Sequence, residues 1–261
     1  PPQGALRTNT SYSEDGSGSV IEHYNGTDWK YFDAIKYCTT NTLNFPSGAG
    51  CIASYNLNNN VNDIGNTYNG VNNNVTFNAS GKFGAAAVFN GSSSYIDLGA
   101  SLLGSRSAFS VSAWVNFDNL NTLNYIFYNS ESGTGTNIGF FDYGWNGNIY
   151  FQPDASTSAN RGYVSNSGIY TTNEWVHIVM VFDGSATGNS NRLKAYIQGQ
   201  PITLTYDGTI PSSSGTSTAN SWIGGRASAK FSGSIDQVRI FNDSLTSDEV
   251  TQLYNNEIAC S

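Results

Sequence analysis

The chain has 261 residues, and 11 Lys and Arg against 19 Asp and Glu give it a net charge of -8 at pH 7. Nucleic acid is therefore not an expected partner, because its binding depends on Lys and Arg contacts to phosphates. Charged residues make up 11 % of the chain and aromatic residues 13 %, whereas disordered chains have high charge and few aromatic residues. The composition predicts a chain that buries a core and covers its surface with uncharged polar groups.

Residues 1–35 predict a small N-terminal β-meander module. The expected strands are 5–10, 20–24 and 28–32. Asn25-Gly26 lies between the last two strands and is a strong hairpin-turn signal. Three short strands are marginal as an independent fold, so we expect this module to serve attachment or oligomerisation.

Residues 36–51 predict a linker, because Pro46, Gly48 and Gly50 interrupt any regular pattern. The main domain is expected at 52–261.

The chain contains three cysteines, Cys38, Cys51 and Cys260. An odd count allows at most one disulfide within the chain. A Cys38–Cys51 bridge would clip the turn-rich linker, whereas a Cys51–Cys260 bridge would tie the start of the main domain to its end. The sequence leaves both pairings open, and plain thiols as well.

Strands with period-two alternation dominate the main domain. The clearest are 109–117, 149–152, 175–182 and 193–198. In 109–117 the alternation points one apolar face to a core, and 175–182 is apolar at nearly every position, as in a central strand. We predict an all-β fold, a two-sheet antiparallel β-sandwich of the jelly-roll type.

One helical segment is expected at the end of the chain. Thr246 and Glu249 fit a capping box, and Leu245 and Val250 occupy the positions of a hydrophobic staple. We expect a short docking helix that covers one end of the sandwich.

Neither a membrane anchor nor a secretory leader is recognisable. No apolar run approaches the roughly 20 residues that a helix needs to span a bilayer, so membrane insertion is not expected. The first residues, Pro1 to Gly4, lack the basic head and apolar stretch of a leader, and no initiator Met precedes them. We expect a part of a longer polypeptide rather than a chain whose leader was removed.

Five segments of the main domain carry a family resemblance. They are Asn-Asp-Ile-Gly-Asn at 62–66, the Gly-Lys-Phe-Gly and Phe-Asn-Gly stretch at 81–98, the strand at 109–115, Trp-Val-His and Tyr-Ile-Gln-Gly at 175–199, and the closing strand at 231–241 with its helix. In this order they resemble the laminin-G-like (concanavalin A-like lectin/glucanase) jelly-roll domains. The resemblance covers 52–257 and implies a jelly roll over most of the chain.

The N-terminal module carries a second resemblance. Segments 4–10 and 22–29 are similar to the short β-meander of bacteriophage tail-fibre and other virion appendage proteins, and Cys38 to Thr42 is similar to spacers between their tandem domains. This resemblance implies a location on a virion, other virion proteins as partners, and a homotrimer as one form of assembly.

No motif of a hydrolase is present. Enzymatic members of the resembled superfamily carry Glu-x-Asp-x-x-Glu on one strand, which places two carboxylates on one face, and this sequence lacks it. It also lacks the Gly-x-Ser-x-Gly elbow. His177 shares a strand face with Trp175 and Val179, so a packed core histidine is favoured over a catalytic one. We expect no enzymatic activity.

The resemblance implies a structural calcium ion held by Asp63 and Asp236, with Asn58 as a lesser ligand. Calcium takes several oxygen ligands from carboxylates, amides and carbonyls. In the alternative, Asp236 accepts hydrogen bonds from the backbone or from Arg239 and binds no metal.

The best candidate for a ligand site is the aromatic-rich stretch with Phe141, Asp142, Tyr143 and Trp145. Aromatic faces can stack on sugar rings while polar side chains bond their hydroxyls, and Tyr125 and Tyr128 are expected on a nearby strand. In the alternative, Phe141 and Trp145 simply pack a hairpin.

The sequence is compatible with three functions. The favoured one is a non-enzymatic virion appendage of the tail- or head-fibre type, whose jelly roll contacts a host-surface glycan or receptor or decorates the particle. The second is a secreted or cell-surface bacterial carbohydrate-binding module, which would be extracellular. An active glycan hydrolase ranks last.

Overall fold

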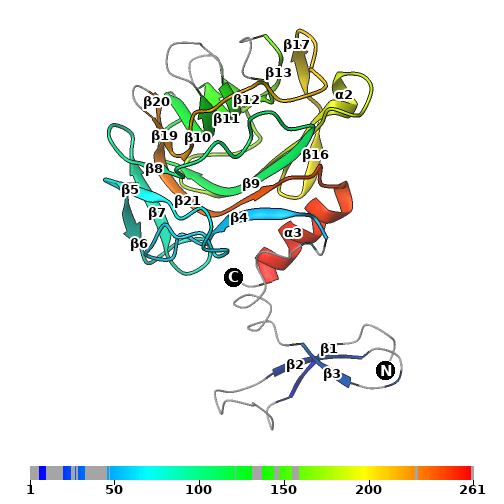
Figure 1. The fold of residues 1–261 in the computed structure, drawn as a ribbon. Coiled ribbons are helices and arrows are strands. Elements are labelled where there is room, and N and C mark those ends of the chain that lie inside the picture. The colour runs from blue at the N-terminus through cyan, green and yellow to red at the C-terminus, as the bar shows by residue number, and fades with distance from the viewer. Residues whose placement is uncertain are drawn as a thin grey trace.

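The structure is a computed structural model. It describes residues 6–9, 20–24, 27, 29–32, 46, 48–120, 122–130, 137–143, 147–154, 159–226 and 229–259. Within these ranges the fold is an antiparallel β-sandwich with few helices, as the sequence predicts (Figure 1). The module and linker boundaries stay a prediction.

Two large sheets form the sandwich, and we call them Sheet I and Sheet II. Sheet I runs in the order β17 (Thr205–Asp207), β13 (Arg161–Ser165), β12 (Asn148–Gln152), β11 (Asn137–Tyr143), β10 (Leu123–Ser130), β18 (Ser221–Ile223), β8 (Tyr95–Asp97) and β5 (Val71–Asn73), with β19 (Gly225–Arg226) and β20 (Ala229–Lys230) beside β10. Sheet II runs β16 (Gln200–Ile202), β15 (Leu193–Ile197), β14 (Trp175–Asp183), β9 (Ala108–Phe117), β21 (Ser232–Phe241), β7 (Ala86–Asn90) and β6 (Thr76–Asn78), with β4 (Cys51–Tyr55) paired to β21. The short helix α2 (Asn189–Arg192) lies between β14 and β15 in the chain.

The three predicted N-terminal strands are present as β1 (Leu6–Asn9), β2 (Val20–Tyr24) and β3 (Trp29–Phe32). They form a three-stranded antiparallel sheet of their own. The Asn25-Gly26 turn between β2 and β3 lies outside the described residues.

The core lies between the inner faces of the two sheets. From Sheet II, the alternating residues of β9 that the sequence assigns to a core are all fully buried, which confirms that prediction. From Sheet I, Phe127, Phe140 and Phe151 enter the same cluster. Because one face of each sheet is fixed in this core, the residues between these positions along each strand point outward.

The C-terminal helix α3 (Ser247–Ala259) begins at the predicted capping box. The Thr246 backbone N–H donates to Glu249 Oε2 at 2.8 Å, and the Glu249 N–H donates to Thr246 Oγ1 at 3.3 Å. Leu245 and Val250 are both buried, as the staple predicts. The helix has 13 residues.

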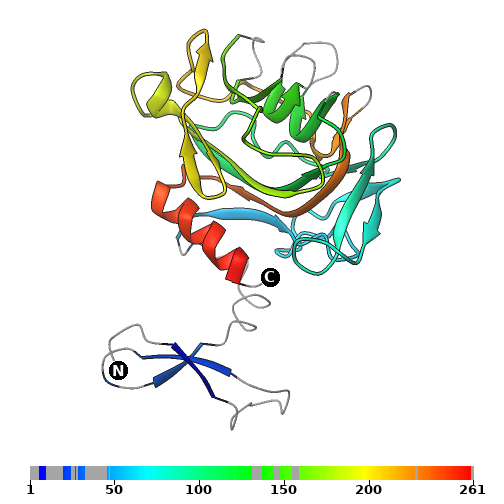
Figure 2. The ribbon, with the colours of Figure 1, turned by 180° about the vertical axis from the view of Figure 1, so that it is seen from behind.

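The predicted position of α3 needs a correction. The helix does not cover an end of the sandwich. It packs on the outer face of Sheet II, where Val250 and Leu253 join Val179, Val181 and Tyr196 in a second apolar cluster. Figures 1 and 2 show α3 (red) beside β4 and β16 from both sides. The outer face of β14 is apolar and requires this cover, which explains why the strand reads as apolar on both sides.

His177 lies beneath α3 and is fully buried, as the sequence favours. Its ring packs 5.1 Å from the Trp114 ring and 5.7 Å from the Tyr254 ring, and Nε2 lies 2.7 Å from Ser112 Oγ. Burial, together with the smaller effect of the Arg239 charge, lowers the pKa of His177 to about 3. The imidazole is therefore neutral in the folded protein.

This burial predicts a pH dependence of stability. His177 titrates near pH 6.5 when unfolded, so the unfolded chain binds a proton that the folded chain does not between about pH 6.5 and 3. Stability should therefore fall as the pH falls through this window. His177→Gln removes the titration, and its Tm should fall less than the wild-type Tm between pH 7 and 5 in thermal unfolding. Parallel Tm profiles for the two proteins would contradict the assignment.

Candidate functional site

The outer face of Sheet I carries a continuous row of aromatic rings, which we call the aromatic row. In order across β13, β12, β11, β10 and β18 these rings are Tyr163, Tyr150, Phe141, Tyr125, Tyr128 and Trp222, with successive ring centroids 4.5 to 6.0 Å apart. Each ring has at least one strand neighbour that packs in or against the core, such as Phe140 beside Phe141 and Ile223 beside Trp222.

A β-bulge in β10 makes the row continuous. Tyr125 and Tyr128 are three residues apart, so a regular strand would place them on opposite faces. The register shifts between Tyr125 and Phe127, and the extra residue Ile126 enters the core. Bulges re-aim side chains in this way, and both tyrosines therefore lie on the outer face with centroids 4.5 Å apart.

The middle of the aromatic row is closed to solvent. Phe141 is 1 % exposed, Tyr150 5 % and Tyr125 6 %. These three rings form a buried cluster of their own, flanked by the half-buried Tyr128 and Tyr163. Trp222, at one end of the row, is 4 % exposed as well. Among these rings, the half-buried Tyr128 and Tyr163 are therefore the ones that a stacking ligand can reach.

At the β8 and β18 end the row opens into a cavity of about 370 Å³, which we call the Trp222 pocket. It is lined by Tyr95, Asp97, Ala219, Asn220 and Trp222. Ile96 is held in the core, so its neighbours Tyr95 and Asp97 point outward. The pocket thus combines aromatic rings with a carboxylate and an amide.

The polar groups of the pocket are held in place. Asp97 Oδ1 accepts the Asn220 side-chain amide at 2.8 Å and the Gly99 N–H at 2.9 Å. The Lys230 ammonium lies 4.5 Å from the centroid of the Tyr95 ring, and desolvation lowers the pKa of Lys230. Hydroxyl-rich ligands bind where fixed hydrogen-bond donors and acceptors lie beside aromatic rings.

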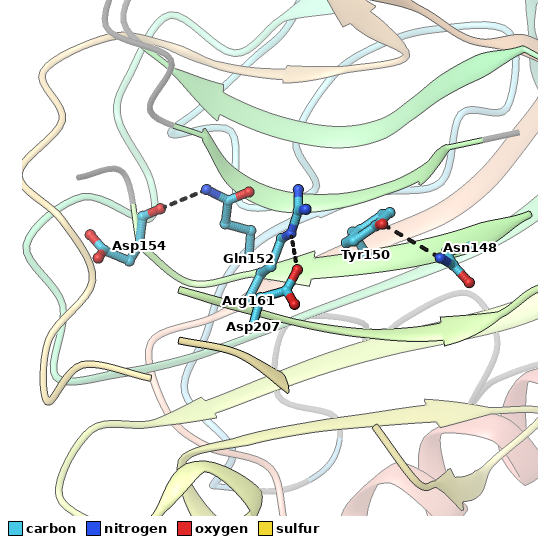
Figure 3. Close-up of polar contacts among 6 residues, drawn as sticks. All are labelled: Asn148, Tyr150, Gln152, Asp154, Arg161 and Asp207. Atoms are coloured by element: carbon cyan, nitrogen blue, oxygen red, sulfur yellow. Dashed lines mark hydrogen bonds and ion pairs between the residues drawn. The ribbon is translucent and has the colours of Figure 1, made fainter. Parts of the chain in front are cut away.

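The β12, β13 and β17 end of the row carries a second polar group. Arg161 Nε donates to Asp207 Oδ2 at 3.2 Å, and the guanidinium carbon lies 4.1 Å from the centroid of the Tyr150 ring. Figure 3 shows Arg161 between Tyr150 and Gln152 on the same side of the sheet. Gln152 Nε2 donates to the Asp154 backbone carbonyl at 3.1 Å.

The structure describes only some of the residues that the sequence predicts to bind a ligand. Phe141 lies in the aromatic row, packed between Tyr125 and Tyr150, as the hairpin-packing alternative describes. The Tyr143 side chain and all of Trp145 lie outside the described residues.

Asp142 lies on the opposite face of β11 from Phe141, so it is not available to a ligand on the outer face. It is fully buried, and it accepts hydrogen bonds from the Asn166 amide at 2.8 Å and the Tyr170 hydroxyl at 3.1 Å. Burial raises the pKa of Asp142, and hydrogen bonds from Asn166, Asn124 and Tyr170 oppose this. Its role is to fasten the edge of the core.

The Trp222 pocket is not among the sites predicted from the sequence. The sequence does contain a signal for Tyr95 and Asp97. They flank the apolar Ile96, which is the alternation expected of a strand with one outward-facing side. Asn220 lies 123 residues from Asp97 in the chain, and no local pattern joins the two.

The residues predicted to hold calcium have protein partners. Both oxygens of the buried Asp63 carboxylate accept backbone N–H groups: Ser54 and Gly65 donate to Oδ1, and Thr67 and Tyr68 donate to Oδ2, at 2.9 to 3.1 Å. Asp63 therefore orders the loop that follows β4.

Asp236 and Asn58 likewise bind backbone groups. The Asp236 oxygens accept the Phe83 and Gln237 N–H groups at 2.9 and 2.8 Å, and Asn58 Oδ1 accepts the Ala85 N–H at 2.7 Å. Within the described ranges, no group of three or more His, Cys, Asp and Glu could hold a metal ion. These contacts do not fit a shared calcium site, and the calcium ion stays a prediction from the resemblance.

Cys51 carries a free thiol, and burial raises its pKa to about 11. Both predicted disulfide pairings use Cys51, so the structure contains neither of them, and Cys38 and Cys260 themselves lie outside the described residues. No described helix has both the length and the apolar character needed to cross a membrane.

Comparison with known proteins identifies the fold. The family model for the concanavalin A-like lectin/glucanases superfamily matches residues 90–251. Domain 4 of AbnA, a GH43 extracellular arabinanase from Geobacillus stearothermophilus, solved in complex with arabinotriose, is similar with a TM-score of 0.61 and 25% identity over 79% of this chain and 98% of that chain. No curated protein matches the chain in sequence.

Two botulinum neurotoxin structures share the fold. They are the binding domain of serotype D, with a TM-score of 0.58 and 19% identity over 82% of this chain and 53% of that chain, and the receptor binding domain of the C/D mosaic serotype, with 0.56 and 18% over 79% and 51%. The chain spans about half the length of these two structures.

The contacts of Asp63 predict a structural role without metal. Asp63→Ala leaves four backbone N–H groups without their acceptor, and the free energy of unfolding should fall by about 3 kcal/mol or more. Asp248→Ala, which removes an exposed carboxylate, is the control and should change it by less than about 1 kcal/mol.

Thermal unfolding with excess calcium or with EDTA should give the same wild-type Tm. A calcium-dependent rise in Tm that Asp63→Ala abolishes would contradict this role of Asp63 and support the calcium prediction.

Proposed function

The chain belongs to the concanavalin A-like lectin/glucanases superfamily, and we propose that its jelly roll is a non-catalytic glycan-binding domain. The binding surface is the outer face of Sheet I at the Trp222 pocket. The sugar ring stacks on Tyr95, Asp97 and Asn220 bond its hydroxyls, and the largely buried Trp222 forms part of the pocket wall.

The pocket is the observation that carries this proposal. Four of its five lining residues offer an aromatic face, a carboxylate or an amide. The Asp97–Asn220 hydrogen bond of 2.8 Å fixes an acceptor beside a donor before any ligand arrives, which lowers the entropy cost of binding.

The similar arabinanase domain supports a sugar as the ligand, because that domain was solved with arabinotriose. The carboxylates of the pocket support binding rather than hydrolysis. Glycoside hydrolases use two carboxyl groups that flank the scissile bond, and Asp97 is the one acid among the residues that line the pocket.

On its biological setting, we propose a virion appendage of the tail- or head-fibre type, with a host-surface glycan or receptor as the ligand and other virion proteins as partners. The separate sheet of β1, β2 and β3 supports this setting, because a three-stranded sheet is marginal alone and gains stability from a neighbour or from copies of itself. A homotrimer is the assembly proposed for it.

A secreted or cell-surface bacterial carbohydrate-binding module is the second candidate. The similarity to a domain of an extracellular arabinanase favours it. Proteomics of purified phage particles separates the two: the chain in the particle fraction supports the appendage, and its absence there with glycan binding intact supports the module.

A glycan array tests the binding function. The full chain should bind a subset of glycans, and Asn220→Ala and Tyr95→Ala should each lower the affinity at least tenfold, since each removes a contact of about 1.4 kcal/mol or more. Ile64→Ser, which changes an exposed side chain away from the face, is the matched control and should bind as wild type. Binding that survives both pocket variants would contradict the pocket as the site.

A further inference from the structure

Arg161 is held in one orientation at the edge of Sheet I. Its Nε donates to Asp207 Oδ2 at 3.2 Å, and its guanidinium lies over the Tyr150 ring at 4.1 Å. Arg161 and Asp207 are directly opposite each other in the β13–β17 ladder. The Asp207 carboxylate on one side and the Tyr150 ring beneath it together fix the orientation of the guanidinium plane.

Arg161, Asp207 and Tyr163 carry further polar groups that can take a ligand. In the part of the chain that the structure describes, no contact uses the two Nη groups of Arg161, Oδ1 of Asp207 or the Tyr163 hydroxyl. The side chains of Arg161 and Asp207 are 24% and 41% exposed. Figure 3 shows the Nη atoms of Arg161 directed away from Asp207. Donors and an acceptor thus lie side by side, open to solvent.

This arrangement matches a pair of neighbouring sugar hydroxyls. Each hydroxyl can accept from an Nη group and donate to a carboxylate oxygen, and the Arg161–Asp207 pair offers both. Tyr163 is two residues along β13 from Arg161 and packs on the same Tyr150 ring at 5.3 Å, so it provides a ring face at the side of the pair.

The charges favour a neutral sugar over an acidic one. Asp207 offsets the charge of Arg161, and its side chain is 41% exposed. The chain as a whole carries a charge of -8. A carboxylate on the ligand would meet the Asp207 carboxylate and this net charge, whereas uncharged hydroxyls would not.

We propose that Arg161, Asp207 and Tyr163 form a second sugar subsite, which takes a neutral sugar by a pair of adjacent hydroxyls. This inference rests on the proposed glycan-binding function and adds a second contact point to it. Four strand spacings separate β13 from β18, or about 19 Å at the usual spacing of strands. Because Tyr150, Phe141 and Tyr125, between the two ends, are at most 6 % exposed, the subsite and the Trp222 pocket bind separately.

Protein-observed NMR on the full chain tests the subsite, with the backbone amide of Tyr163 reporting on it and the indole N–H of Trp222 reporting on the pocket. The ligands are arabinotriose, galactotriose and trigalacturonic acid, of which the last two differ by carboxyl groups. A neutral trisaccharide should shift the Tyr163 amide saturably. Trigalacturonic acid should bind there at least tenfold more weakly than galactotriose, and Asp207→Asn should narrow that difference.

Variants separate the two binding points. Arg161→Ala should weaken the sugar affinity reported by the Tyr163 amide at least tenfold and leave the affinity reported by Trp222 within twofold. Arg161→Lys should restore little of the affinity at Tyr163, because an ammonium group lacks the two parallel N–H donors of the guanidinium. Lys194→Ala, an exposed cation on Sheet II, is the control and should change neither reporter.

The outcomes that overturn the proposal are distinct. Equal responses at Tyr163 in wild type and Arg161→Ala, or binding of the acidic ligand as tight as that of the neutral one, refute the subsite. A response at Trp222 with none at Tyr163 refutes the subsite and leaves the glycan-binding function standing. No response at either reporter to any of the three sugars refutes both.

Discussion

The arrangement of the ligand-facing residues depends on one constraint, the burial of the inner faces of Sheet I and Sheet II against each other. Phe140 and Phe141 are neighbours in β11, yet the first enters the main core and the second joins the aromatic row. The same alternation holds in β8. Because Ile96 is buried in the core, its neighbours Tyr95 and Asp97 point outward. A slip of one residue would exchange the two faces, so the core fixes the chemistry of the outer surface.

Local patterns predict much of this fold. The alternation in β9 and the capping box of α3 depend on residues a few positions apart, and the structure confirms both. The β10 bulge is not predictable in this way, because Ile126 looks like any strand residue and the shift depends on its partner strands. The inward orientation of Asp142 is likewise not predictable from local sequence, because its hydrogen-bond partners Tyr170 and Asn166 lie 28 and 24 residues away in the chain. The Trp222 pocket joins β8 to β18 across most of the domain sequence, which no spacing rule reveals.

Sheet II and Sheet I use their outer faces differently. The outer face of Sheet II carries an apolar cluster beside buried polar groups such as His177, and α3 covers it, with Trp114 stacked on Tyr254 at 5.7 Å. The outer face of Sheet I has closed rings at its centre and a cation over a ring near each end, Arg161 on Tyr150 and Lys230 on Tyr95. These cations keep the aromatic ends polar in a chain with few charges, and they leave carboxylates and amides beside exposed ring edges. A surface of this kind suits hydroxyl-rich ligands better than ions or apolar chains.

Amide hydrogen exchange measured by mass spectrometry, with and without saturating arabinotriose, tests most directly whether the outer face of Sheet I binds sugar. Exchange should be slower in peptides that cover β8 and β18 and in those that cover β13 and β17, with Sheet II unchanged. Slower exchange confined to β14, β15 or α3, with no change in Sheet I, would contradict it.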